Sequence, residues 1–142
     1  MPTRSAAFVS RCPGRRRHPQ TRHLAALADS VSVQVRALGE DERIALFARL
    51  KDDKDNDLRG AGLLFLPAAK AVTLDPQSSP AQRRAAIAFL SAWTTQPIDE
   101  PHPRDVGFEG RVQLYRTLTD IPSPPNIAIA ARGVVERAEQ HK

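Results

Sequence analysis

Residues 79–93 read SPAQRRAAIAFLSAW and contain the signals of one amphipathic helix. Ser79 suits the N-cap, Pro80 suits a first helical position because its missing N–H needs no partner there, and Gln82 stands where a capping box places it. The larger apolar residues that follow recur at intervals of three and four and therefore share one face: Ala86, Phe89, Leu90 and Trp93. We predict that this helix is the centre of the fold, with the other segments packed on it.

Five further segments have apolar residues at helical spacing. Two of them also alternate as strands would, at Val31, Val33 and Val35 and again at Val112, Leu114 and Leu118. Helix is favoured in both because the longer pattern agrees with it. The five segments are Thr21–Leu38, Glu40–Leu50, Leu58–Leu74, Phe108–Ile121 and Asn126–Gln140. The predicted fold class is all-α, a small irregular bundle of four to six helices.

Local signals refine this bundle. Pro67 must break or kink the helical segment around it. Two helices separated by Gly39 resemble a helix-turn-helix. However, the second helix begins with three acids, which disfavours it as a DNA-reading helix. An ordinary helical hairpin is predicted instead. The longest apolar run, Leu63–Ala69, is too short to cross a bilayer, so no membrane contact is expected.

The basic residues are unevenly distributed. The chain carries a net charge of +5, yet residues 1–28 hold six arginines and no acid, while the other 114 residues hold 15 basic and 16 acidic side chains. Residues 1–20 are predicted to form a disordered Arg-rich arm, and residues 21–142 a single helical domain. The basic character therefore belongs to the arm.

Three interpretations of the arm remain open: an extension without a specific role, an organellar targeting segment, and a nucleic-acid-binding arm. The residues that would contact phosphates are Arg11, Arg15, Arg16, Arg17 and Arg22. No aromatic residue lies among them to stack on bases, which disfavours sequence-specific binding of single strands. Removing residues 1–28 is expected to weaken nucleic-acid binding and to leave the body folded.

Candidate catalytic and metal-binding groups are few. The densest cluster is the proline-rich loop with Asp99, His102 and Asp105, where an acid beside a histidine could orient a base or bind a metal, although charged surface loops commonly hold such neighbours. The stretch KDDKDND at residues 51–57 begins like a calcium loop but lacks its glycine and its final glutamate, and a solvated turn is favoured. Neither a metal nor a cofactor is predicted.

Three functional hypotheses follow. The favoured one is a non-enzymatic helical interaction or regulatory protein that binds another protein and touches nucleic acid, or another acidic surface, through its arm. The second is a small enzyme or metal-binding protein that uses the Asp99–Asp105 loop. The third is an organelle-targeted protein whose N-terminal segment is cleaved. A single cysteine, Cys12, and no secretory signal favour an intracellular, cytoplasmic location, with organellar import as the alternative.

Overall fold

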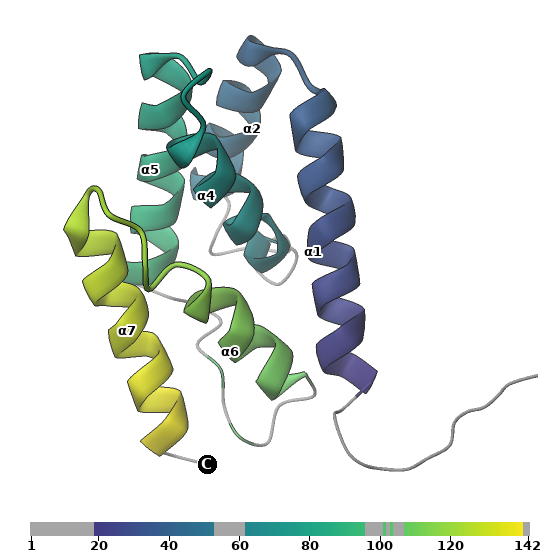
Figure 1. Ribbon diagram of the computed structural model, residues 1–142, viewed down its shortest axis with the longest axis vertical. Coiled ribbons are helices and arrows are strands. Elements are labelled where there is room, and N and C mark those ends of the chain that lie inside the picture. Colours follow the sequence, from purple (N-terminus) through teal and green to yellow (C-terminus); the bar gives the residue numbers. More distant parts are fainter. Residues whose placement is uncertain (1–18, 53–61, 96–100, 102, 104–106, 141–142) are drawn as a thin grey trace, which may run out of the picture.

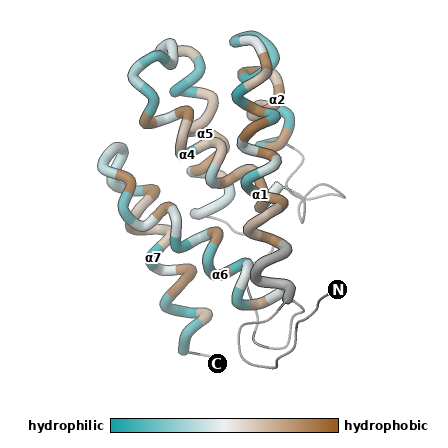
Figure 2. Tube along the Cα trace, turned by 45° about the vertical axis from the view of Figure 1, so that its right-hand side comes forward, coloured by the Kyte–Doolittle hydropathy of each residue, from teal (hydrophilic) through white to brown (hydrophobic). Residues whose placement is uncertain are grey.

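The computed structural model describes residues 19–52, 62–95, 101, 103 and 107–140, with the backbone alone for residues 19–23. Within these ranges the chain is all-α, which confirms the predicted fold class (Figure 1). The elements are α1 (Pro19–Ala37), α2 (Glu40–Asp52), the 3-10 helix η2 (Leu63–Phe65), α4 (Leu66–Leu74), α5 (Pro80–Thr95), α6 (Phe108–Arg116) and α7 (Pro125–Gln140). Hydrophobic and hydrophilic residues intermingle along each helix, as amphipathic helices require (Figure 2).

Helix α5 is a major part of the core, but the other segments do not all pack on it, although the sequence predicted that they would. It packs against α2, α4 and α7, while α1 runs along one side of the molecule and packs against α4, η2 and α6 (Figure 1). The apolar face read from the sequence is the buried face: Ala86, Phe89, Leu90 and Trp93 are each fully buried. The 58–74 segment does pack on α5 through α4, as expected, but α2 packs on α5 more extensively.

Aromatic rings form the middle of this core. The ring of Phe89 lies 5.5 Å from that of Phe47 on α2 and 5.9 Å from that of Trp93, measured between centroids. The indole N–H of Trp93 donates to the carbonyl of Leu50 at 3.2 Å, so its one polar atom is satisfied inside the core. Trp93 therefore serves the core, and α5 does not present it as a binding surface.

The break at Pro67 follows from its missing N–H. A continuous helix would need that N–H to donate to the carbonyl of Leu63, but proline has none to give. The N–H of Leu66 donates to Leu63 instead, which produces the 3-10 turn η2, and α4 then begins with Pro67 in its first turn. Just before η2, Gly62 lies so close to the Trp93 ring that a side chain there would overlap it.

The predicted hairpin of α1 and α2 is wrong. The two helices meet at Gly39 but diverge, because α1 packs on α4, η2 and α6 whereas α2 packs on α5 (Figure 1). The apolar residues of each helix face those partners: Ala28 and Val35 of α1 are buried, as is Phe47 of α2. Spacing along one segment identifies its buried face but not the helix that covers it.

Residues 21–38 and 108–121 are both helical rather than extended, as predicted, although α6 ends at Arg116. Beyond it, two turns bury Leu118 and Ile121 before α7 begins at Pro125. Helix α1 also corrects the expectation that residues 1–28 can be removed and leave the body folded. Ala28 is only 3% exposed, and Leu24 lies against Gly110 of α6, so deleting residues 1–28 would remove part of the packed body.

Candidate functional site

Most of the predicted site residues fall outside the described part of the chain. Arg11, Arg15, Arg16 and Arg17 precede it, and Asp99, His102 and Asp105 lie in the gaps before α6. The calcium-like acids Asp53, Asp55 and Asp57 also lie outside it. Arg22 is placed in the first turn of α1, without its side chain. The structure therefore does not bring these groups together or separate them, and both proposed sites stay predictions.

A polar cluster joins the first turns of α2 and α5. The Ser79 hydroxyl accepts from the backbone N–H of Gln82 at 3.2 Å, which is the capping bond predicted from the sequence. The same hydroxyl donates to Glu40 at 3.0 Å. The side chain of Gln82, which a full capping box would direct to the Ser79 backbone, lies near Glu40 instead, at 3.4 Å.

Arg43 connects this cluster to the C-terminal end of α1. Its guanidinium donates to the Gln82 side chain at 2.7 Å, to the carbonyl of Val35 at 3.0 Å and to the carbonyl of Arg36 at 2.8 Å. The last carbonyls of a helix have no partner within the helix and carry its negative dipole end, so a cation there stabilises them. One side chain thus fixes the ends of three helices.

The electrostatics of α5 explain why Glu40 takes part. The first turn of α5 contains Arg83 and no acid, although a helix N-terminus favours negative charge. Glu40 of α2 supplies that charge from a neighbouring helix. Arg83 turns away and donates to the carbonyl of Asp75 at 2.8 Å.

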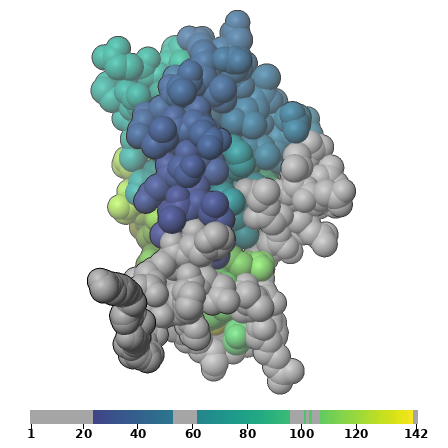
Figure 3. Space-filling view, turned by 90° about the vertical axis from the view of Figure 1, so that its right-hand side faces the viewer, coloured from purple at the N-terminus to yellow at the C-terminus, as the bar shows by residue number. Residues whose placement is uncertain are grey.

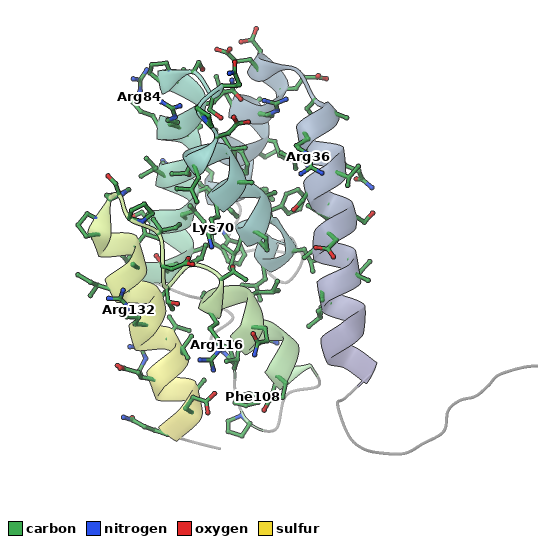
Figure 4. The ribbon with its side chains drawn as sticks, viewed as in Figure 1. Arg36, Lys70, Arg84, Phe108, Arg116 and Arg132 are labelled. Atoms are coloured by element: carbon green, nitrogen blue, oxygen red, sulfur yellow. The ribbon has the colours of Figure 1, made fainter. Side chains whose placement is uncertain are left out.

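A second polar cluster surrounds the end of α6. Lys70 of α4 donates to the carbonyl of Thr117 and to the carboxylate of Asp120, each at 2.7 Å (Figure 4). Arg132 of α7 donates to the carbonyl of Thr119 at 2.9 Å. Lys70 therefore binds the carbonyl at the C-cap of α6, where the helix dipole is negative, while Arg132 binds a carbonyl in the turns that follow, and the two cations join α4 and α7 to this segment.

The pKa of the acid in this second cluster, Asp120, is lowered. The Lys70 ammonium lowers the pKa of the Asp120 carboxyl below its ordinary value of 3.8, first through the hydrogen bond and then through the attraction of opposite charges. Asp120 is exposed, so water screens the pair. This carboxylate is held in its charged form and is poorly suited to act as a proton donor near neutral pH.

The buried hydroxyls have local structural roles. Thr73 donates to the carbonyl of Ala69 and Thr94 to that of Leu90, each within its own helix, while Tyr115 donates to the carbonyl of Trp93 at 3.5 Å. Within the described residues, no group of three or more His, Cys, Asp and Glu side chains is arranged to hold a metal ion. Of these three hydroxyls, only that of Tyr115 connects two helices.

Sequence reasoning placed Ser79 and Gln82 at the start of α5, but it did not predict the long-range partners in either cluster. Arg43 and Lys70 carry no local motif, because their partners lie up to 50 residues away in the chain. Only the arrangement of the helices reveals these contacts.

One exposed surface is poor in charge. The solvent side of α1 faces the viewer in Figure 3 and carries two of the large apolar side chains that remain exposed among the described residues, Leu27 and Val33, at 38% and 57%. Leu27 and Val33 lie about 120° apart around the helix and do not form one patch, but Val33 lies opposite the buried Ala28 and Val35, and that outer face of α1 is a candidate contact surface.

No family model, no curated protein and no solved structure matches this chain. Among the residues that the structure describes, no helix combines the length and the apolar character that a bilayer crossing requires.

Proposed function

We propose that this is a non-enzymatic, intracellular interaction protein whose basic N-terminal arm binds a polyanion, with the phosphate backbone of nucleic acid as the favoured partner. The observation that carries the proposal is the separation of charge along the chain. Six arginines and no acid occupy residues 1–28, whereas the remaining 114 residues are nearly neutral, with 15 basic and 16 acidic side chains. A local excess of arginine attracts phosphates whatever the net charge of the body.

Several cationic side chains of the body already bind groups within the body, which supports this proposal. Arg43 and Lys70 donate to backbone carbonyls at helix ends, Arg132 donates to a carbonyl in the turns after α6, and Arg116 pairs with Glu139 at 3.0 Å. These cations are engaged in holding the bundle together. The arginines of residues 1–18 are therefore the better candidates for contact with a partner.

The main group of arginines has no aromatic residue within it. No Phe, Tyr or Trp lies between Arg11 and Arg22, so stacking cannot supply sequence preference. We expect binding to depend strongly on salt and weakly on nucleotide sequence. The helical body has the separate role of binding another protein.

The test is a binding titration of the full-length chain with fluorescent duplex and single-stranded probes of scrambled sequence. Replacing Arg15, Arg16 and Arg17 by glutamine should weaken binding, because phosphate contacts are lost. Each lost contact should also reduce the slope of log affinity against log salt concentration by about 0.9 on duplex DNA. The control replaces the exposed body residues Lys51 and Arg84 by glutamine and should bind as the wild type does.

Two outcomes contradict the proposal. One is binding that is absent at low salt or insensitive to salt. The other is a loss of binding in the Lys51 and Arg84 variant that equals the loss in the arm variant, because the contact would then belong to the body.

A further inference from the structure

We propose that the outer face of α1 binds the same face of a second copy of this chain, with the two α1 helices antiparallel. The buried side of α1 is centred on Ala28 and Val35. At about 100° per residue, the opposite side is centred on residues that are small or aliphatic and exposed. These residues are Ala26, Ser30, Val33 and Ala37, at successive intervals of four, three and four.

This spacing is that of a helix–helix seam. Residues at alternating intervals of three and four form one stripe, and small side chains let two helix backbones approach closely. Val33, 57% exposed, would be covered by the second helix. The stripe alone does not identify its partner, but the charges beside it do.

Asp29 and Arg36 are the only charged residues between Leu24 and Gly39, and both are exposed. They are seven residues apart and therefore lie on the same flank of the stripe. When an identical helix is laid antiparallel on this face, the same flanks meet, and Asp29 of each copy lies beside Arg36 of the other. The surface is thus complementary to itself in the antiparallel direction, as a two-fold interface requires.

The ends of α1 favour the same direction. Its 19 residues span about 28 Å. The arginine-rich residues 1–18 precede one end, and the exposed acids Glu40, Asp41 and Glu42 follow the other. An antiparallel pair brings the N-terminal end of each α1, which has no acid in its first turn, toward the acidic turn of its partner.

The contact is small, because it involves about three turns of one helix from each copy. A single helix pair lies at the lower end of interface size, where complexes are weak and transient. We therefore expect a monomer–dimer equilibrium in the range from micromolar to submillimolar.

Sedimentation velocity of the full-length protein over this concentration range tests the proposal. Replacing Asp29 by arginine, or Arg36 by aspartate, should weaken dimerisation at least about tenfold, because two attractive pairs become repulsive. The double variant Asp29→Arg/Arg36→Asp should dimerise as the wild type does, since the pairs are restored with reversed sign. The matched control is Glu136→Arg, an equal change of charge at an exposed position on α7, which should leave dimerisation unchanged.

Each substitution is on the surface, and circular dichroism verifies that the fold is intact. A wild-type chain that stays monomeric at every concentration overturns the proposal, as does a double variant that dissociates like the single ones. A dimer that forms only after residues 1–18 are removed would show that the N-terminal segment of the chain covers α1 instead, which also overturns it.

Discussion

Replacing Gly62 by alanine tests the packing of the core most sharply. Gly62 is buried and has helical dihedral angles, φ −57° and ψ −31°, so its backbone conformation suits any residue. The obstacle to a larger residue at this position is steric. A Cβ atom there would lie 2.6 Å from the Cη2 atom of Trp93 and closer still to Cζ2, and Trp93 is 0% exposed with its N–H bonded to Leu50. The ring cannot move away without disturbing its neighbours.

The magnitude follows from three effects. Overpacking a dense core costs about 1–3 kcal/mol. A displaced indole would also weaken its hydrogen bond to Leu50, which contributes about 1 kcal/mol. Alanine returns up to about 1 kcal/mol, because glycine is the poorer residue in a helix. The net expectation is a loss of about 1–3 kcal/mol in the free energy of unfolding.

Urea unfolding followed by circular dichroism measures this loss, with Gly133→Ala as the matched control. Gly133 lies inside α7, where a Cβ atom would meet only the Nη1 atom of the flexible Arg137 side chain, at 3.3 Å. The same substitution should therefore stabilise the protein there by about 1 kcal/mol. If Gly62→Ala proves as stable as the wild type, Trp93 does not pack on residue 62 as described, and the reasoning is refuted.

Three further perturbations test the polar clusters and a turn. Glu40→Gln should lower the stability by about 0.5–1 kcal/mol in urea unfolding, because α5 loses the acid at its N-terminus, and an unchanged midpoint would refute that role. Asp120→Asn should cost stability at neutral pH and progressively less as the pH falls: the folded-state pKa of Asp120 is lowered, so its contribution is present above pH 3.8 and is lost as the pH falls through the folded pKa, which thermal unfolding at several pH values would detect. Gly107→Ala should destabilise by about 1 kcal/mol or more because Gly107 has φ 83°, and a thermal midpoint equal to that of the wild type would contradict this.

The sequence was informative where structure is local. The capping signal at Ser79 and the spacing up to Trp93 predicted the start of α5 and its buried face, because both depend on neighbours within a few residues. The helical interpretation of residues 21–38 was also correct: Val35 is buried while Val33 is exposed, and a strand would have placed both on one side.

Long-range arrangement could not be predicted in the same way. The prediction of a hairpin of α1 and α2 was wrong because other helices cover the apolar face of each. Periodicity in the sequence does not identify those helices. Gln82 turned from its expected capping role because Glu40 and Arg43 reach it from another helix. The candidate functional residues belong to the arm and to the Asp99–Asp105 loop. There the spacing of residue types indicated a possible chemistry, but it did not predict how the side chains are placed relative to one another.

The most direct test of the central claim is the salt dependence of nucleic-acid binding by two full-length proteins. One is the wild type, and the other has glutamine in place of the five arginines of residues 1–18, which are Arg4, Arg11, Arg15, Arg16 and Arg17. The account predicts that the wild type binds duplex DNA with a steep fall in affinity as salt rises, and that the variant loses most of both the affinity and the slope. Equal affinities and equal slopes for the two proteins would contradict it.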